Sequence, residues 1–341
     1  MRRDLQRYAA ANARVRTLIP TLLGHSGLEA LYGYPSRDTM LDVLLHTAYG
    51  RRLSKPRGEG SLRERLVEIG RTLIRMLASP EAALVRVYLL RHELENLKLV
   101  IRAVHRRLSP ETVSRYLFVL GDISSLDTQR LVEARDLHEL TDRLATTAYG
   151  APMAAALHRL EDAGPFALEV ALEIDYYERL WEAAGVLEPS DGKRAHGLLG
   201  ILFDILNLGW IARYRDALGM APEEILNYTL RQGRWVTFAV RRALAEGPQL
   251  PWGVALEHTP YARLLAEADM RGFDACSAAL WRFLAAAAQR EFRGYPFHIG
   301  VPLAFLLTQE LEIRDLQVLL TAKTLGLNST EAFEHVVTIR H

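Results

Sequence analysis

The string RHELEN, which begins at Arg91, starts like the zinc-protease motif His-Glu-x-x-His. In that motif, two histidines four residues apart lie on one face of a helix and bind one zinc ion, while the glutamate serves as general base. Asn96 stands where the second histidine would be. Because one ligand is missing, we interpret RHELEN as the polar edge of a core helix and not as a metal site.

A second acidic stretch, EIDYYERLW, brings together the carboxylates of Glu173, Asp175 and Glu178. Carboxylates on facing helices can hold a pair of metal ions, but such sites also use Glu-x-x-His pairs. No Glu-x-x-His occurs anywhere in the chain. Apolar residues recur at helical spacing through the same stretch, so an ordinary helix with one buried face is the better interpretation.

Motifs for nucleotide binding and nucleophilic catalysis are also missing. The string GEGS at Gly58 lacks the Gly-Lys-Ser/Thr ending of a P-loop, and no Gly-x-Ser-x-Gly elbow occurs. The 11 histidines are scattered, so a base, an orienting acid and a nucleophile cannot be assigned from them. Cys276 is the only cysteine, which excludes a disulfide framework and a cysteine-based zinc site. We therefore expect no active site, no metal and no cofactor.

Composition and charge indicate which classes of partner and which cellular location to expect. The 42 Lys and Arg residues nearly balance 41 Asp and Glu, for a net charge of +1, whereas nucleic-acid-binding domains carry a basic excess. The longest apolar run, Gly197 to Ala212, is shorter than the roughly 20 residues that span a bilayer, and Asp204 interrupts it. Arginines break the apolar N-terminal stretch, unlike in a signal peptide. We expect a chain without a membrane span or secretion signal, in a reducing cytoplasmic setting.

A short turn sequence recurs along the chain. TAYG occurs at Thr47 to Gly50 and at Thr147 to Gly150, and the related TPYA occurs at Thr259 to Ala262. Between these turns, stretches such as YLLRHELENLKLVIRAVHRR place apolar residues on one stripe of a helix, and capping residues or prolines precede several such stretches. We find no two-residue alternation bounded by hairpin turns. The sequence therefore predicts an all-α fold.

Three of the expected helices share one polar pattern: an acid, two further residues, Asn or Asp, and Leu. The strings are ELENL, DILNL and EIRDL, and they supply the pairs Glu93 and Asn96, Asp204 and Asn207, Glu312 and Asp315. Arg102 and Arg213 add a matched basic position, whereas the third copy has Thr321 with Lys323 nearby. The pattern predicts three copies of one helical unit of about a hundred residues.

The repeat suggests a domain plan. We expect an N-terminal helical arm at 1–20 and helical repeats at 21–120, 121–232 and 233–341. Packed around a pseudo-threefold axis, three such repeats would form a funnel with a central socket; an open superhelix is the alternative. The acids and amides then have two interpretations. They hydrogen-bond neighbouring segments within each repeat, because buried polar groups must be paired, or they line the central opening and contact whatever enters it.

Several longer stretches together resemble the cap of the rotor in rotary V/A-type ATPases, which is the C-type subunit of prokaryotic enzymes and the d-type subunit of eukaryotic vacuolar enzymes. They are YAAANARVR, LRHELENLKLVIRA, ARYRDALGMAPEEILNYTL and YPFHIGVPLAFLLTQELEIRDLQVLLTAKTLGL, and the similarity spans Tyr8 to Leu327. The resemblance implies a non-catalytic rotor subunit at the cytoplasmic face of the membrane. Such a subunit seats the central shaft, with its D- and F-type subunits, on the proteolipid ring and transmits torque between them.

The resemblance also implies where partners would bind. The predicted shaft contacts are Glu93, Asn96, Arg102, Asp204, Asn207, Arg213, Glu312, Asp315 and Lys323. The predicted ring-side rim is Arg51, Arg52, Lys55 and Arg57. The chain departs from the family at Asp315, where an asparagine is usual, and at Thr321. No nucleic acid and no small-molecule substrate are expected, and the alternatives are an all-helical adaptor scaffold or an acid-rich α-helical enzyme.

Overall fold

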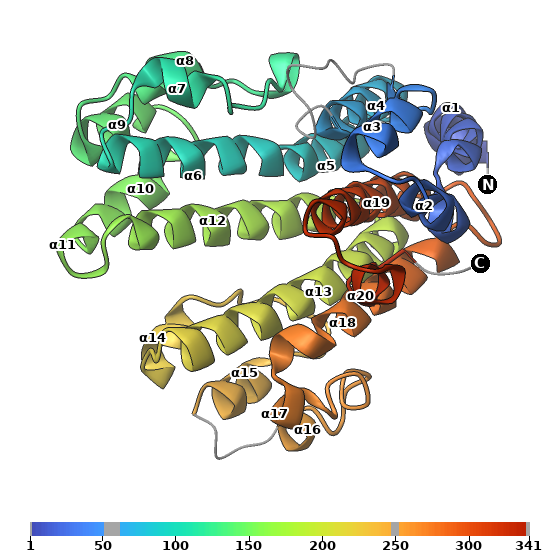
Figure 1. Cartoon of the computed structure of the whole chain (residues 1–341). Helices are drawn as coiled ribbons and strands as arrows, with labels where there is room; N and C mark the ends of the chain where they lie inside the picture. Colours follow the sequence, from blue (N-terminus) through green and yellow to red (C-terminus); the bar gives the residue numbers. More distant parts are fainter. Residues whose placement is uncertain (1, 51–61, 247–251, 339–341) are drawn as a thin grey trace. The chain divides into compact units, whose positions relative to one another are not determined.

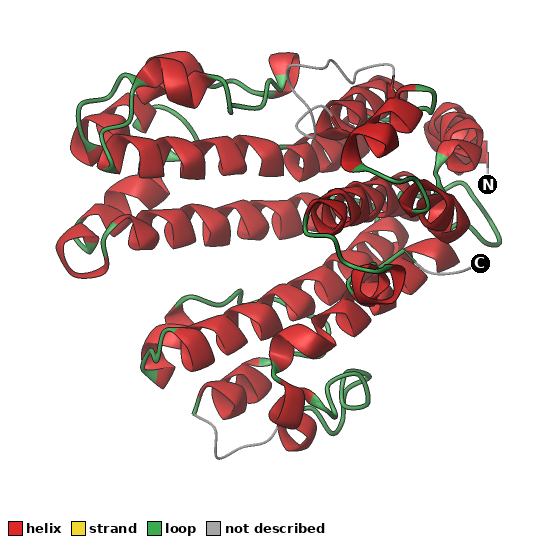
Figure 2. Ribbon diagram, viewed as in Figure 1, coloured by secondary structure: helices red, strands yellow, loops and turns green. Residues whose placement is uncertain are grey.

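The computed structural model describes residues 2–50, 62–246 and 252–338, and within these ranges every regular element is a helix (Figure 2). The predicted all-α fold is confirmed. By its internal contacts the chain divides into two compact units, one made of Met1–Ala82 with Ala184–His341 and the other of Ala83–Ala183. The repeat borders expected after 120 and 232 stay a prediction.

The unit of residues 83–183 is built on two long antiparallel helices. Its elements are the end of α5 (Ser79–Leu89), then α6 (Arg91–His105), α7 (Pro110–Ser114), η4 (Gly121–Ile123), α8 (Thr128–Val132), α9 (Leu137–Leu144), α10 (Gly150–Leu157), α11 (Leu160–Ala163) and most of α12 (Pro165–Gly185) (Figure 1). Lys98 of α6 bonds Glu173 of α12 at 3.1 Å. Farther along α6, Arg102 bonds Glu169 at 2.7 Å. Two ion pairs therefore link these helices.

The other unit joins the two ends of the chain. Its N-terminal elements are α1 (Arg2–Leu18), η1 (Ile19–Thr21), α2 (Gly24–Tyr32), α3 (Arg37–Leu45), α4 (Leu62–Met76) and the start of α5. Its later elements are α13 (Pro189–Ala212), η5 (Arg213–Ala217), α14 (Pro222–Asn227), α15 (Phe238–Ala245), α16 (Trp252–Ala255), α17 (Ala268–Arg271), α18 (Phe273–Arg290), α19 (Gly300–Thr324) and α20 (Ser329–Glu334). Helix α19 packs against α1, α2, α3 and α4 and also against α13, α18 and α20.

The sequence of α19 explains its central place. Apolar residues occur on all sides of this helix, from Val301 through Leu320, and nearly all of them are buried. A helix that is apolar all round must be covered all round. Helix α19 is therefore the core of this unit, and the N-terminal helices supply part of its cover.

One helical stretch in the described part of the chain, Pro189–Ala217, is long and apolar enough to cross a membrane. Its most apolar window has a mean hydropathy of 1.5, and 72% of that window is buried inside the structure. It contains Asp204, which is fully buried. Burial of this extent is typical of a core helix.

The three long helices that carry the acidic pattern end in the same way. Each is followed by a residue in the left-handed region, Arg107 (φ 52°), Gly219 (φ 60°) or Gly326 (φ 71°). Glycine adopts this conformation freely, whereas a residue with a Cβ pays about 1–2 kcal/mol. A new short helix then begins, as the sequence predicts, with Ser109 and Asn328 as side-chain caps. Arg107 therefore carries a backbone strain that the other two copies avoid.

Candidate functional site: three turn–carboxylate clusters

The three repeated turns have one structure. In each, the threonine hydroxyl donates to a carbonyl three residues earlier and accepts from the tyrosine amide two residues later, at 3.2 Å in every copy. The carbonyl bonds are Thr47 to Leu44 at 2.7 Å, Thr147 to Leu144 at 2.7 Å and Thr259 to Leu256 at 2.8 Å. The threonine thus fixes the backbone that presents the tyrosine side chain.

Each turn tyrosine donates its hydroxyl hydrogen to one of the three patterned acids. Tyr149 bonds Glu93 at 2.7 Å, Tyr261 bonds Asp204 at 2.9 Å, and Tyr49 bonds Glu312. The second and third turns thus bind the acid of the long helix that precedes them in sequence. The first turn has no such helix before it and binds the acid of the last one. The two sequence patterns, the turn and the acidic helix, form one repeated contact that closes across the chain ends.

The cluster around Asp204 is the most densely bonded. Its Oδ1 accepts from the amides of Arg234 at 2.9 Å and Val236 at 3.0 Å. Its Oδ2 accepts from the amide of Trp235 at 2.9 Å and from the Tyr261 hydroxyl. The carboxylate is fully buried, so these four donors replace the water that it would otherwise bind.

The other two carboxylates have fewer donors. Glu93, 2% exposed, accepts from the hydroxyls of Tyr149 and Ser124. Glu312, 1% exposed, accepts from the amides of Leu23 at 3.0 Å and Gly24 at 2.9 Å and from Tyr49. Each acid therefore ties a loop and a turn to a long helix, Glu93 at the first turn of α6 and the other two inside α13 and α19.

Burial shifts the pKa of carboxyl and phenol groups in these clusters. It raises the pKa of Asp204 and of Glu312, and the hydrogen bonds to each carboxylate oppose that rise. Burial and the neighbouring acid also raise the pKa of Tyr49, Tyr149 and Tyr261 well above the ordinary value for tyrosine. The phenol therefore keeps its proton and remains a hydrogen-bond donor.

We expect the three tyrosine bonds to differ in their contribution to stability. In a Tyr149→Phe variant, Oε1 of Glu93 keeps no other donor among the described residues, so the free energy of unfolding should fall by about 2–3 kcal/mol. In Tyr261→Phe the same carboxylate oxygen keeps the amide of Trp235, and the loss should be about 1 kcal/mol. Tyr49→Phe should lie between the two, because Leu23 still donates to Glu312 but the buried Gln309 side chain loses the hydroxyl that accepts from it. Urea unfolding of the three variants would measure this order. Equal losses would contradict the assignment of donors.

The amide position of the pattern binds a second loop. Asn96 donates to the carbonyl of Phe118 at 2.6 Å and accepts from its amide at 2.8 Å. Asn207 makes the same pair of bonds with Leu230, at 3.1 and 2.8 Å. This two-way contact needs a side chain that both donates and accepts, which asparagine provides.

The departure at Asp315 follows from the loop that it meets. Its Oδ1 accepts from the amide of Val337 at 2.9 Å and its Oδ2 from the amide of Thr338 at 2.7 Å. Both partners are donors, so a carboxylate satisfies them and an asparagine NH₂ group would not. The third copy uses aspartate because its loop presents two amides.

Exchanging the two residue types should destabilise both sites. Asp315→Asn places an NH₂ group against an amide N–H, and Asn96→Asp removes the donor to Phe118 and buries a charge. We expect each to lower the free energy of unfolding by about 2–3 kcal/mol, measured by urea unfolding. Glu257→Ala, a change at an exposed acid next to the third turn, is the control. A neutral Asp315→Asn variant would show that the two amides have another partner.

The predicted shaft contacts fall into two groups. Six of them are 0–4% exposed and bonded to the chain's own groups: Glu93, Asn96, Asp204, Asn207, Glu312 and Asp315. With the expected repeat bounds, the residues at the amide position bond within their own repeat, whereas each of the three acids bonds a loop and a turn of another repeat. A side chain that lines the predicted central opening must be exposed to solvent, and these six side chains are buried. Arg102 bonds Glu169 yet keeps 54% of its side chain exposed, Lys323 bonds the carbonyl of Tyr32 at 2.7 Å, and Arg213 is exposed. The predicted rim residues Arg51, Arg52, Lys55 and Arg57 lie outside the described residues.

Two arginines that sequence reasoning missed support the turns. The guanidinium of Arg65 lies 4.9 Å from the ring centroid of Tyr49, and that of Arg179 lies 4.9 Å from the ring of Tyr149. Each stands on a helix outside the repeated patterns, so no spacing rule could find it. Only the packing of the helices brings these cations onto the tyrosine rings.

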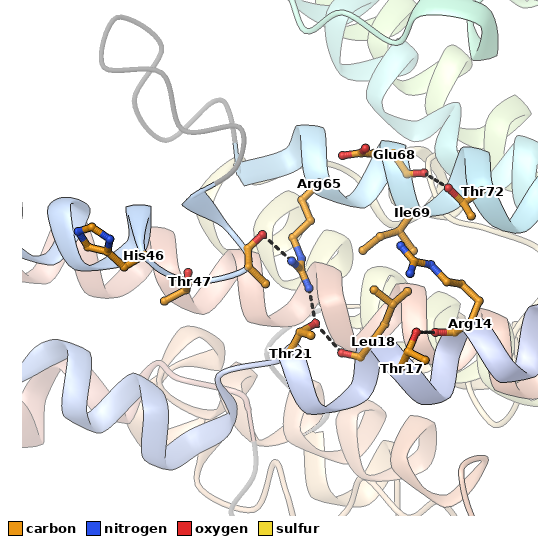
Figure 3. A pocket seen from close by; sticks show the side chains of 11 residues that line it. Arg14, Thr17, Leu18, Thr21, His46, Thr47, Arg65, Glu68, Ile69 and Thr72 are labelled. Atoms are coloured by element: carbon orange, nitrogen blue, oxygen red, sulfur yellow. Dashed lines mark hydrogen bonds between the residues drawn. The ribbon is translucent and has the colours of Figure 1, made fainter.

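Arg65 also lines the cavity drawn in Figure 3, which has a volume of about 870 Å³. From α4 it reaches toward Thr21 and the backbone of the first turn (Figure 3). Its nitrogens donate to the carbonyl of Ala48 at 2.6 Å, the Thr21 hydroxyl at 2.6 Å and the Gln309 side chain at 3.1 Å. These framework bonds account for the orientation of the cation without a ligand.

The acidic stretch EIDYYERLW lies on α12. Glu173 pairs with Lys98, and Asp175 pairs with Arg179 at 2.8 Å. Across residues 2–50, 62–246 and 252–338, no group of three or more His, Cys, Asp and Glu is arranged to hold a metal ion. Two of the three carboxylates singled out in this stretch, Glu173 and Asp175, thus have partners within the protein.

Comparison with known proteins bears on the role of these clusters. Residues 11–334 match the model of the ATP synthase (C/AC39) subunit family. The chain belongs to this family. It is 26% identical to the C-type subunit of the A-type ATP synthase of Methanothermobacter thermautotrophicus, over 94% of this chain and 85% of that protein.

Two other members of the C/AC39 family give similar matches. The C-type subunit of the A-type ATP synthase of Methanocaldococcus jannaschii is 25% identical over 96% of this chain and 86% of its own length. The C-type subunit of the V-type ATP synthase of Thermus thermophilus is 26% identical over 97% of this chain and 98% of its own length. The resemblance seen in the sequence is confirmed, and all three clusters lie within the matched span of this C/AC39 chain.

Proposed function

We propose that this chain is the non-catalytic central-stalk cap of a V/A-type rotary ATPase or ATP synthase that translocates protons or sodium ions. In this role it is a peripheral subunit at the cytoplasmic face of the membrane. It seats the shaft subunits of the D and F type on the proteolipid ring and transmits torque between them. The observation that carries the proposal is the match of residues 11–334 to the ATP synthase (C/AC39) subunit family.

The hydrogen-bond clusters support a mechanical role. A part that transmits torque must resist bending, and close-packed helices transmit strain instead of absorbing it. Each of the three long helices is tied to a turn by a buried carboxylate. In the proposed arrangement, three helical repeats form a funnel around a socket, and these ties fasten each repeat to another.

The alternatives need features that the clusters do not provide. An acid-rich α-helical enzyme would use the carboxylates of Glu173 and Asp175, and both are engaged in ion pairs with basic residues. A stand-alone adaptor scaffold would bind its partners without a membrane complex. Neither alternative explains why the chain is similar along almost its whole length to subunits of ATP synthases.

A pull-down from native membranes tests the proposal. The tagged chain would be expressed in its own organism, recovered from detergent-solubilised membranes and analysed with its bound proteins by mass spectrometry. We expect the proteolipid and the shaft subunits to be recovered together with the chain. The tag on an unrelated soluble protein is the control. Recovery of the chain as a free monomer without ATPase subunits would overturn the proposal.

A further inference from the structure

The end of α6 differs from the ends of the other two patterned helices. All three ends share the left-handed residue and carry an exposed leucine, Leu108 (48%), Leu218 (49%) or Leu325 (69%). Only at the α6 end is the left-handed residue an arginine, Arg107. Glycine would form the same turn without strain, so the fold of the turn does not account for this side chain.

The charge of the three ends differs as well. Equivalent windows, aligned on the left-handed residue, are 102–116, 214–228 and 321–335. The first holds four arginines against one glutamate, the second one arginine, with Arg213 directly before the window, against three acids, and the third one lysine against two glutamates. The same local structure is thus basic once and acidic twice.

The basic side chains of the α6 end are free to bind. Arg106, Arg107 and Arg115 are exposed, and none of them forms an ion pair with a described residue. Tyr116, which follows α7, is 74% exposed. We call these four residues, together with Leu108, the α6 tip.

Stabilisation of helix α6 by nearby cations explains the basic residues of the α6 tip only in part. Cations near the last turn of a helix interact favourably with its dipole. Helix α13 continues into η5, which carries Arg213 and Arg215 before its left-handed glycine, and α19 has Lys323 in its last turn, so these two ends hold cations without placing one at the left-handed position. The dipole thus gives no reason for an arginine at the one position where it strains the backbone.

We propose that the α6 tip is a docking surface for an acidic protein surface of the rotary complex, and that the other two helix ends do not share this role. Arginine and tyrosine are enriched at protein interfaces, where arginine binds carboxylates through two parallel bonds. Leu108 and Tyr116 supply the apolar contact, and the three arginines supply the charge. The inference rests on the proposed function and adds the chemistry of one contact.

An anionic membrane is the competing occupant. Segments that bind acidic lipids usually present clusters of about four to eight basic residues. The tip has three free arginines, and the strained position orients a single side chain, which suits a defined carboxylate better than a fluid surface. The membrane therefore becomes an outcome of the test.

The test replaces Arg107 by glycine, the residue found at the left-handed position of the other two helix ends. Arg107→Gly removes the charge and relieves the backbone, so the variant should unfold at the same urea concentration as the wild type or a higher one. The labelled chain would be titrated onto the detergent-solubilised ATPase stripped of this subunit. We expect the Kd to rise about threefold for Arg107→Gly and about tenfold for the double variant Arg106→Ala, Arg107→Gly. Gly219→Arg, which places an arginine at the equivalent position after α13, is the matched control and should leave the Kd unchanged.

The outcomes separate the two proposals. Failure of the wild-type chain to bind the stripped complex would overturn the proposed function. Binding of the wild type with an unchanged Kd for the double variant would overturn the tip inference alone. The inference also fails if the variants lose affinity only for vesicles of phosphatidylglycerol and phosphatidylcholine, because the tip would then serve the membrane. A photoreactive amino acid in place of Tyr116 should crosslink to a segment rich in Asp and Glu, and a neutral or basic segment would contradict the proposal.

Discussion

Replacing Asp204 by alanine is expected to cost about 4 kcal/mol of unfolding free energy in the unit that contains α13. The change leaves three backbone amides and the Tyr261 hydroxyl buried without an acceptor. Each unsatisfied donor costs about 1–3 kcal/mol, although the loop can relax and recover part of that sum. Urea unfolding followed by circular dichroism would measure the loss.

Two comparisons sharpen this experiment. Glu257→Ala removes an exposed acid beside the third turn and should change stability by less than about 0.5 kcal/mol. Gly233→Ala should also be damaging, because a Cβ at Gly233 would lie 2.4 Å from Oδ1 of Asp204 and would push the carboxylate away from its donors. A stable Asp204→Ala chain would show that the loop after α14 does not depend on the carboxylate.

Deleting residues 1–50 is expected to abolish cooperative folding of the unit that holds α19. Glu312 would lose the amides of Leu23 and Gly24 and the hydroxyl of Tyr49, and the apolar face of α19 that packs on α1, α2 and α3 would be exposed. The apolar residues of this face would then meet water, and the stabilisation that comes from burying them would be lost. Hydrogen exchange of the α19 amides would report the loss.

The remaining unit provides the internal control for this deletion. The cluster of Glu93, Ser124 and Tyr149 lies wholly within residues 83–183, so the α6 amides should keep their protection. Protection of α19 that survives the deletion would contradict the closure of the repeat across the chain ends. Loss of protection in both α6 and α19 would show that the two units do not fold independently.

Much of this architecture could be predicted from the sequence. The spacing of TAYG and of the acidic pattern identified the turns and the long helices, because both are local features with a fixed period. The pairing of turn with acid could not be predicted. Tyr49 lies 263 residues from Glu312, and nothing in the local sequence says which acid a turn tyrosine will bind.

The sequence also left the role of the acids open. Buried and exposed polar positions look alike beside an apolar stripe, so Glu93 could equally have faced a neighbouring loop or an opening. The hydrogen bonds of the structure favour the loop. Asp315 stands out in the sequence as a departure, and its reason, two amide donors in the partner loop, lies in backbone geometry that composition does not encode.

The proposed torque role is tested most directly by measuring whether ATP hydrolysis is coupled to ion transport. The ATPase of the source organism, with and without this chain, would be reconstituted into vesicles, and ATP hydrolysis and ion uptake would be measured in parallel. We predict that complexes lacking the chain still hydrolyse ATP but take up no ions, and that adding the purified chain restores uptake. Undiminished ion uptake in its absence would contradict the proposed role as the link between shaft and ring.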